Sequence, residues 1–181
     1  MDLNRLLKPT TIAVIGGGAW CESIMSAAQQ IGYKGTIIPI HPSGKNIAGV
    51  KSLKSLSMFP GTIDAAFVGV NRYATIDIIN ELRALGAGGA TCFASGFSEA
   101  AAEDVAGTSL QKKLIEAAGD MPILGPNCYG FLNSFDKCGI WPDQHGCRGV
   151  DRGVAILTQS SNIAINITMQ NRALPLSLIH I

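Results

Sequence analysis

Short apolar runs alternate with amphipathic stretches along the first 130 residues of the chain. Apolar runs rich in β-branched residues and alanine predict strands at 11–15, 36–40, 64–70, 89–93 and 122–124. Helices are predicted between them, at 22–31, 76–85 and 110–118. This alternation is typical of βαβ units, so the pattern predicts an α/β fold with an open, doubly wound parallel sheet.

Two of the predicted strands carry further information about their places in the sheet. The run from Thr11 to Ile15 is continuously apolar and ends at Gly16, which is typical of a strand that is covered on both faces. The run 36–40 contains Pro39, which has no backbone N–H to donate. We therefore expect Pro39 to lie near an end of its strand or on an edge strand of the sheet.

The pattern changes after residue 130. Residues 131–152 have little periodicity, so we expect an irregular connection there. Residues 153–157 predict another buried strand. The isoleucines of 163–167 alternate as in a strand, but Ser160-Ser161-Asn162 is a good helix start, and we favour a helix.

These observations predict a first domain at 1–130 and the beginning of a second α/β domain at 153–181. A further apolar run begins at Leu176, close to the last residue, Ile181. A domain of this length cannot close its own core. We therefore expect the second domain to be truncated and the chain to be a piece of a longer protein.

Composition narrows the class of protein. The chain has 181 residues, of which 47% are hydrophobic and 15% charged, with a net charge of +1. So much apolar surface excludes a disordered chain, and so little net charge excludes the broad basic face that nucleic-acid binding requires. No targeting segment is evident, and no apolar run approaches the ~20 residues of a membrane helix, so we expect a cytoplasmic protein.

The five cysteines are scattered along the chain, and none forms a Cys-x-x-Cys pair. A disulfide framework or a zinc site would need closer, paired spacing. We therefore expect reduced thiols and no metal site.

The glycines that follow the first predicted strand indicate a phosphate ligand. Gly16-Gly17-Gly18 is followed by a predicted helix, whose N-terminus offers unpaired N–H donors and a favourable dipole. The fingerprint for nicotinamide dinucleotides fails, because Cys21 stands where its third glycine belongs and no acid follows the second strand. Lys45 lies there instead and suits a ribose that carries an extra phosphate, either in NADP or in coenzyme A (CoA).

Several further motifs occur in one order along nearly the whole chain. They are Leu7-Lys8-Pro9, Thr11 to Gly16, Pro42-x-Gly44-Lys45, Ala94 to Glu99, Gly125-Pro-Asn-Cys-x-Gly130 and Leu157 to Ser160. In these motifs the chain resembles the CoA-binding domain of NDP-forming acyl-CoA synthetases, the group that includes the succinyl-CoA synthetase α subunit. The resemblance implies a Rossmann-like CoA-binding domain followed by a flavodoxin-like domain.

The resemblance also implies which residues bind CoA. The nucleotide end would lie on the backbone donors of the turn formed by Gly17, Gly18, Ala19 and Trp20. Lys45 would pair with a phosphate, and Arg72 is either a second phosphate contact or a solvated arginine. The rest of the cleft would be lined from the carboxyl ends of two strands, by Val70, Asn71, Arg72, Ala94, Ser95 and Gly96.

Four further positions match the part of the family that handles a phosphohistidine. Asn127 and Cys128 stand where the family brings its active-site histidine, and Ser160 and Ser161 open the helix that receives the phosphohistidine. The family usually has glycine at the position of Ser161. A nucleophilic Cys128 would need a nearby base, so we favour a structural thiol.

None of the histidines His41, His145 and His180 matches the phosphorylated histidine of the family. His41 follows the second predicted strand, where it either touches a phosphate or is an ordinary surface residue, which we favour.

The resemblance implies a ligase that joins a small carboxylic acid to CoA, with ATP and Mg²⁺ supplied by an ATP-grasp domain or subunit, through an acyl phosphate and a phosphohistidine. This chain lacks the ATP-grasp domain, so we expect it to bind CoA without catalysis and the full-length protein to be an oligomer.

Two other interpretations stay open. One is an NADP-binding oxidoreductase domain, and the other is a CoA sensor or the CoA-binding module of a protein acetyltransferase.

Overall fold

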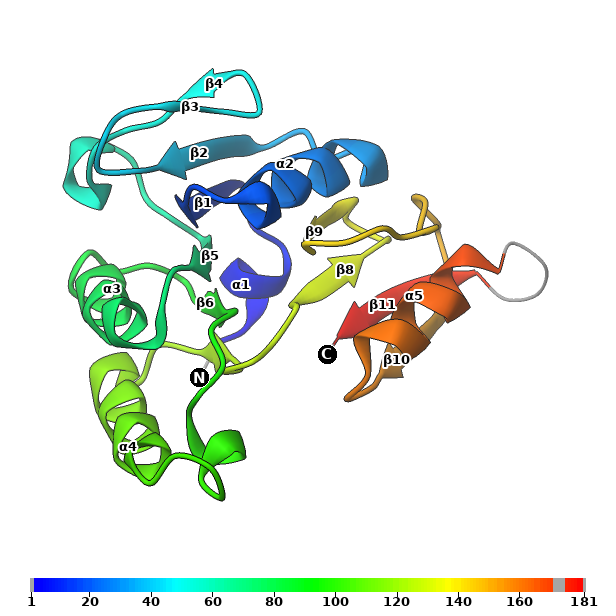
Figure 1. Ribbon diagram of the computed structural model, residues 1–181. Coiled ribbons are helices and arrows are strands. Elements are labelled where there is room, and N and C mark those ends of the chain that lie inside the picture. The colour runs from blue at the N-terminus through cyan, green and yellow to red at the C-terminus, as the bar shows by residue number, and fades with distance from the viewer. Residues whose placement is uncertain (1, 171–174, 181) are drawn as a thin grey trace.

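A five-stranded parallel sheet forms the centre of the first part of the chain in the computed structural model, which describes residues 2–170 and 175–180 (Figure 1). The strand order is β2-β1-β5-β6-β7. The strands are β1 (Thr11–Gly16), β2 (Thr36–Ile40), β5 (Ala65–Gly69), β6 (Ala90–Cys92) and β7 (Ile123–Leu124). All five lie within the predicted strands, apart from Gly16 at the end of β1. Pro39 lies on the edge strand β2, which is one of the two places expected for it.

Helices cover both faces of this sheet, which confirms the doubly wound, Rossmann-like α/β fold. The helices α3 (Arg72–Ala84) and α4 (Ala106–Ala118) lie on one face, and α1 (Asn4–Leu7) and α2 (Ala19–Ile31) lie on the other (Figure 1). Two 3₁₀ turns, η1 (Leu56–Met58) and η2 (Ser98–Ala100), lie in the connections, and β3 (Asn46–Ile47) pairs with β4 (Val50–Lys51) in a small hairpin beyond β2. The chain changes direction across the sheet between β1 and β5, which is the switch point where such sheets bind ligands.

The helix α2 begins earlier than its apolar pattern predicts. Its first residue is Ala19 rather than Glu22, because Gly18 serves as the N-cap in an extended conformation. No side chain caps this end of the helix. At the other end Gly32 has a φ of +93°, and its N–H bonds to the carbonyls of Ala28 and Gln29.

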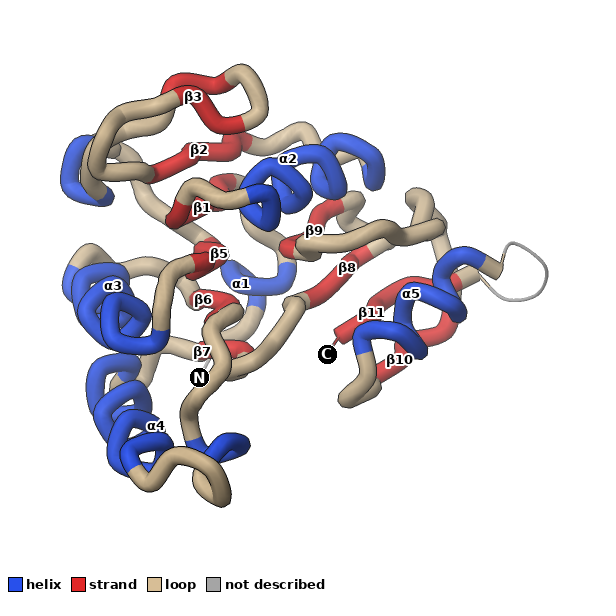
Figure 2. Tube along the Cα trace, in the orientation of Figure 1, coloured by secondary structure: helices blue, strands red, loops and turns tan. Residues whose placement is uncertain are grey.

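A second, four-stranded sheet corrects the expectation for residues 131–152. Its order is β10-β11-β8-β9 (Figure 2). The strands are β8 (Phe131–Asn133), β9 (Cys138–Ile140), β10 (Val154–Leu157) and β11 (Leu176–His180). The segment expected to be irregular therefore contributes the antiparallel hairpin β8–β9, and β8 also pairs with β11. The periodicity was uninformative because each of these two strands has only three residues and is buried along its whole length.

The helix predicted after Ser160 is confirmed as α5 (Ser161–Met169), which connects the parallel strands β10 and β11. The buried environment expected for β10 is wrong, since the Leu157 side chain is 74% exposed and Val154 is 42% exposed. Within the described residues β10 pairs only with β11, so it is an edge strand. The division into domains at 130 and 153 stays a prediction, and residues 171–174 and 181 of the predicted second domain lie outside the described residues.

The helix α2 lies between the two sheets. Ile24 and Met25 share a buried cluster with residues of β1 and β5, and with Phe131 and Cys138 of the hairpin. Ala27 and Ile31 belong to a different cluster, which contains Trp141 and the second-sheet residues Leu132 and Ile179. Both sheets therefore bury apolar side chains against the same helix.

Within the described part of the chain, no helix has the length and apolar character needed to cross a membrane. No group of three His, Cys, Asp or Glu side chains in it is arranged to hold a metal ion.

His145 makes the packing of α2 sensitive to acid. His145 is 1% exposed, and its Nε2 lies 3.3 Å from the carbonyl of Ala27. The side chain of Gln30 donates a hydrogen bond to the backbone carbonyl of His145. Burial lowers the pKa of His145 below its ordinary value of 6.5, so below pH 6.5 the unfolded chain binds a proton that the folded chain resists.

We therefore expect the free energy of unfolding to fall as the pH drops below 6.5, by at most ~1.4 kcal/mol per pH unit from this group. Urea titrations between pH 8 and 5 measure the effect, and His145→Gln should reduce the slope. The pKa values of Asp104 and Asp136 are lowered by their hydrogen bonds to Arg72 and Lys8, so these carboxyls contribute only at lower pH. An equal slope in the variant would show that His145 is not responsible.

Candidate functional site

A cleft lies at the carboxyl ends of β1, β2 and β5, at the switch point of the sheet. Its volume is about 370 Å³. Its floor comes from the ends of the three strands, and one wall comes from α3 and the segment before η1. The lining residues are Ile15, Gly16, Gly17, Ile40, His41, Pro42, Lys54, Ser55, Leu56, Gly69, Val70, Ala74, Ile78 and Glu81.

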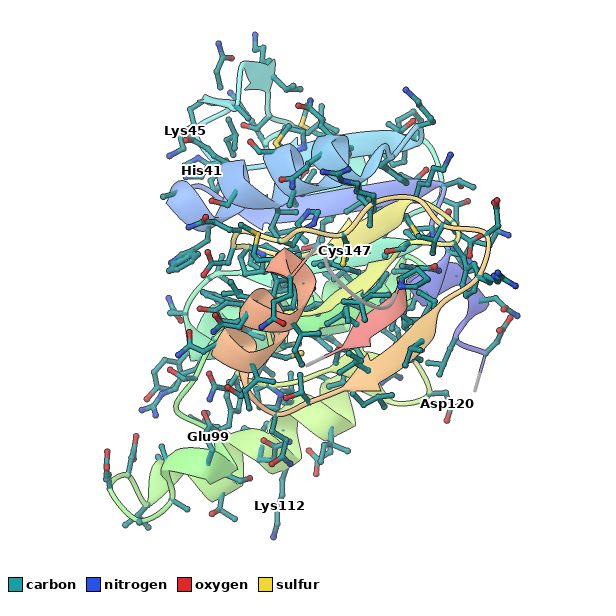
Figure 3. The ribbon with its side chains drawn as sticks, turned by 90° about the vertical axis from the view of Figure 1, so that its right-hand side faces the viewer. His41, Lys45, Glu99, Lys112, Asp120 and Cys147 are labelled. Carbon is teal, nitrogen blue, oxygen red and sulfur yellow. The ribbon has the colours of Figure 1, made fainter. Side chains whose placement is uncertain are left out.

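Gly17 lies directly beneath two side chains from the loop after β2. Lys45 Nζ donates a hydrogen bond of 2.5 Å to the carbonyl of Gly17. A Cβ atom on Gly17 would lie 2.5 Å from His41 Cδ2 and 2.7 Å from Lys45 Cε, so only glycine leaves room for both. Figure 3 shows His41 and Lys45 next to one another beside α2. The glycine turn, the start of α2 and the two side chains therefore form one unit.

His41 is held in a fixed orientation within this unit. The backbone N–H of Ser43 donates to His41 Nδ1 at 3.2 Å, and the Ser43 hydroxyl lies 2.8 Å from the same atom. Because Nδ1 accepts the bond from Ser43, the neutral ring carries its proton on Nε2. Nε2 is also the nitrogen nearest Gly17, where it would lie 2.8 Å from an added Cβ. His41 thus lines the cleft, although the sequence favoured an ordinary surface residue.

The residues predicted to follow β5 have three different surroundings. Val70 lines the cleft. Asn71 is the N-cap of α3, and its Oδ1 accepts hydrogen bonds from the N–H groups of Tyr73 and Ala74. The Arg72 side chain donates to the carbonyl of Gly96 at 2.8 Å and forms an ion pair of 2.5 Å with Asp104. In this conformation Arg72 joins α3 to the loop after β6, so a phosphate contact would require it to give up Asp104.

The predicted residues after β6 contact a second loop instead of the cleft. The N–H of Asn127 donates a 2.9 Å hydrogen bond to the carbonyl of Ala94. Gly96 donates its N–H to Glu99 and has a φ of +94°, while Ser95 is exposed. Ala94 therefore supports the Gly125–Cys128 loop, whereas Gly96 is bonded to Glu99 and Arg72.

A second cavity lies between that loop and the end of β10. Its volume is about 390 Å³, and it is lined by Gly125, Pro126, Asn127, Cys128, Leu157, Thr158 and Gln159. The Ser160 hydroxyl caps α5 by accepting a hydrogen bond from the N–H of Ile163, and Ser161 is the first residue of the helix. The structure thus brings the Gly-Pro-Asn-Cys and Leu-Thr-Gln-Ser motifs together, which their distance in sequence could not show.

Cys128 lies in this cavity as a protonated thiol. It is 4% exposed, and burial raises its pKa to about 11. A thiol with this pKa is almost entirely uncharged at neutral pH and is therefore a poor nucleophile. The environment agrees with a structural thiol.

Three aromatic rings from separate parts of the chain form a cluster. Trp20 stands on the first turn of α2, Phe93 follows β6, and Tyr129 follows Cys128. The ring of Phe93 lies 5.3 Å from that of Trp20 and 5.7 Å from that of Tyr129, and the rings of Trp20 and Tyr129 are 6.4 Å apart. The sequence predicted neither this cluster nor the places of Lys54 and Glu81 in the cleft, because these side chains come from elements far apart in the chain and form no motif.

Comparison with known proteins identifies the family. The family described as a CoA binding domain matches residues 10–134, a segment that contains the whole five-stranded sheet, the cleft and the Gly125–Cys128 loop. The chain belongs to this family of CoA-binding domains. The resemblance predicted from the motifs is confirmed.

Relatives of this CoA-binding domain occur in acyl-CoA-forming enzymes. The chain is 32% identical over 140 residues to the trans-feruloyl-CoA synthase FCS1 of an unknown prokaryotic organism, an alignment that covers 75% of the chain and 20% of that protein. It is 31% identical over 139 residues to the ADP-forming acetate–CoA ligase II of Archaeoglobus fulgidus, covering 74% of the chain and 20% of the ligase. The chain thus spans about 20% of the length of these relatives.

A solved structure resembles nearly the whole chain. It is the acetyl-coenzyme A synthetase 1 of Candidatus Korarchaeum cryptofilum, described as dinucleotide forming and solved in complex with phosphate and ADP. It has a TM-score of 0.82 and 26% sequence identity, and the match covers 99% of this chain and 39% of that one.

The glycine turn of this CoA-binding domain allows a matched test of backbone constraint. Gly16 has a φ of +128°, and a Cβ there would lie 2.5 Å from the carbonyl oxygen of Gly69. Gly18 has a φ of −90°, and a Cβ there would meet nothing within 4 Å. We expect Gly16→Ala to lower the free energy of unfolding by about 2–4 kcal/mol and Gly18→Ala by less than ~1 kcal/mol in urea titrations. Equal losses would contradict this account of the turn.

The cysteines allow a second test. All five are buried thiols outside any disulfide, and burial raises the pKa of Cys92 and of Cys138 to about 12. We expect an aromatic disulfide that reports thiols by its absorbance to react slowly with the native chain at pH 7.5, at the rate at which the fold opens. In denaturant the same reagent should titrate all five thiols quickly. One thiol that reacts at once in the native chain would show an exposed thiolate.

Proposed function

We propose that this chain binds coenzyme A in the cleft at the switch point, as the CoA-binding part of an ADP-forming acid–CoA ligase. The observation that carries the proposal is the unit formed by Gly17, the uncapped N-terminus of α2, Lys45 and His41. Membership of the CoA-binding domain family supports the same ligand.

Each part of this unit suits a phosphorylated ligand. The first turn of α2 has no side-chain cap, so its N–H groups can donate to an anion, and the helix dipole favours negative charge there. Lys45 adds a positive charge, and its bond to the Gly17 carbonyl fixes that charge over the turn. His41 presents an N–H in the same place. In the proposed complex Lys45 contacts the 3′-phosphate of CoA, and the turn of Gly17, Gly18, Ala19 and Trp20 holds the pyrophosphate.

The second cavity suits the reacting end of the ligand. It joins the Gly125–Cys128 loop to the segment that precedes α5, so residues of both sheets face it. In the proposed enzyme Asn127, Cys128, Ser160 and Ser161 lie near a phosphohistidine that another part of the protein brings. The reaction would convert a carboxylic acid, CoA and ATP into acyl-CoA, ADP and phosphate, and an ATP-grasp domain or subunit would bind ATP and Mg²⁺. The chain alone would bind CoA without turnover.

The names of the relatives support this class of reaction. They are a feruloyl-CoA synthase and an ADP-forming acetate–CoA ligase, and both are longer than this chain. Enzymes of this kind work on soluble metabolites, so the proposed location of the full protein is the cytoplasm. An NADP-binding domain is the second candidate, because Lys45 would suit the 2′-phosphate of NADP equally well.

Titration calorimetry with CoA, dephospho-CoA and NADPH decides between the two ligands. We expect CoA to bind more tightly than dephospho-CoA, which lacks the 3′-phosphate. Lys45→Ala should weaken CoA about 10-fold, the equivalent of ~1.4 kcal/mol for one charged contact, and leave dephospho-CoA almost unchanged.

Lys112→Ala is the matched control, because Lys112 lies on α4, far from Lys45 in Figure 3, and should change neither affinity. Tight binding of NADPH without any response to CoA would overturn the proposal in favour of the second candidate. If Lys45→Ala weakens the binding of CoA and of dephospho-CoA equally, Lys45 does not contact the 3′-phosphate.

A further inference from the structure

One arginine side chain joins three elements beside the candidate site. Arg72 is the first residue of α3, and its Nη1 donates a hydrogen bond of 2.8 Å to the carbonyl of Gly96 in the loop after β6. The same nitrogen forms an ion pair of 2.5 Å with Asp104, which lies just before α4. Nη2 donates to the hydroxyl of Tyr73 at 3.0 Å. Arg72 therefore ties the starts of α3 and α4 to the loop that connects β6 to α4 (Figure 1).

The ion pair is partly shielded from water, and both of its ends are attached to helices. The side chain of Arg72 is 22% exposed and that of Asp104 is 36% exposed. The hydrogen bond from Arg72 lowers the pKa of Asp104, so this carboxyl is charged at neutral pH. Asp104 Oδ1 also accepts a hydrogen bond of 2.9 Å from the N–H of Ala106, at the start of α4.

The segment that Arg72 holds supports one wall of the second cavity. The carbonyl of Ala94, two residues before Gly96, accepts a hydrogen bond of 2.9 Å from the N–H of Asn127. Asn127 lines the cavity and has a φ of +53°, which residues other than glycine rarely adopt. Such a backbone conformation persists only where neighbouring contacts hold it. The position of the segment 94–96 thus bears on the shape of the cavity.

The rest of the loop after β6 has an anchor of its own. The Phe97 side chain is fully buried in the core of the first sheet. A Cβ atom on Gly107 would clash with the carbonyl oxygen of Phe97, so the loop packs closely against α4. Loss of the Arg72 contacts should therefore release Gly96 and Ser95 without unfolding the loop.

We propose that Arg72 is a positioning residue for CoA binding. Together with Asp104 it fixes the Ala94–Gly96 segment and, through Ala94, the Gly125–Cys128 loop beside the second cavity. This inference rests on the proposed function. It assigns Arg72 a role other than the phosphate contact that the sequence left open, because the guanidinium already donates to a carbonyl, a carboxylate and a hydroxyl.

The sign of the effect of Asp104→Asn decides between the two roles of Arg72. If Arg72 positions the loop, removing the charge of its partner should weaken CoA about 3- to 10-fold in titration calorimetry. If Arg72 contacts a phosphate, the same change frees the guanidinium and should strengthen CoA binding. Asparagine can still accept the N–H of Ala106, so the start of α4 keeps its cap.

Arg72→Lys tests the geometry of the side chain. Lysine keeps the positive charge but lacks the planar fork that reaches both acceptors, so it should weaken CoA about 3- to 10-fold, whereas a phosphate contact would largely survive. The double variant Arg72→Lys with Asp104→Asn should bind CoA no more weakly than the weaker single variant, because both changes remove one interaction. Two losses that add would show that the residues act independently, and the proposal would be wrong.

Two control variants match these changes in charge and in place. Glu103→Gln removes the same charge one residue away, and Glu103 is exposed and takes part in no ion pair among the described residues. Arg83→Ala removes a second arginine that joins α3 to α4, since Arg83 Nη1 donates to the carbonyl of Glu116 at 3.1 Å. Neither should change the affinity for CoA. Thermal unfolding of every variant shows whether the fold is intact.

Hydrogen exchange gives a readout that needs no ligand. The N–H of Asn127 bonds to Ala94, so it should exchange at least ~5-fold faster in Arg72→Lys and Asp104→Asn than in the wild-type chain. In Arg83→Ala it should exchange at the wild-type rate. Unchanged exchange in the first two variants would show that the loop does not depend on Arg72.

The outcomes separate the inference from the function on which it rests. If exchange at Asn127 is faster but the variants bind CoA as tightly as the wild type, the segment does not serve the ligand, and CoA binding itself still stands. Tighter binding in Asp104→Asn would return Arg72 to the role of a phosphate contact. A wild-type chain that does not bind CoA contradicts the proposed function and the positioning role together.

Discussion

The packing of α2 between the two sheets is the constraint on which the rest of the structure depends. The buried face of α2 contacts both sheets. Ile24 and Met25 lie in a cluster with residues of both sheets, and Ala27 and Ile31 lie in a cluster with residues of the second sheet. Small side chains at Ala27 and Ala28 suit a helix that is enclosed on two sides. A shift of either sheet along this helix would open a cavity in the core that the sheet shares with the helix, and such cavities are costly.

This packing also fixes the position of the candidate site. Gly17, which lies just before α2, lines the cleft, and the buried face of α2 holds the helix against both sheets. Close contacts at Gly16 and Gly17 then set the distance from the turn to β5 and to His41 and Lys45. Rigid secondary structure thus places groups that come from loops, which is the usual arrangement in open α/β sheets.

The parts of the fold that the sequence could predict are those with local patterns. Four long apolar runs and a stripe of isoleucine and leucine residues were enough for the parallel sheet and α3, and Ser160 marked the start of α5. The hairpin β8–β9 was not predicted because each strand has only three residues and because β11, the other partner of β8, pairs with residues 45 to 49 positions earlier in the chain. At the site, glycine and Lys45 carried a recognisable motif. Other features depend on which segments meet in space, so only the structure could reveal them. They are the ion pair of Arg72 with Asp104, the helix cap formed by Asn71, and the cluster of Trp20, Phe93 and Tyr129.

The walls of the second cavity come from two sheets, since Gly125–Cys128 belongs to the loop after β7 and Leu157 to β10. A molecule that fills this cavity touches both sheets at once. Because a ligand that binds only the folded chain lowers its free energy by mass action, occupation of the cavity would strengthen the junction between the sheets as well as the site itself. The exposed strand β10 has one strand partner among the described residues, so a ligand in the cavity would add a second contact that stabilises it. A ligand in this cavity would therefore stabilise the contact between the two sheets.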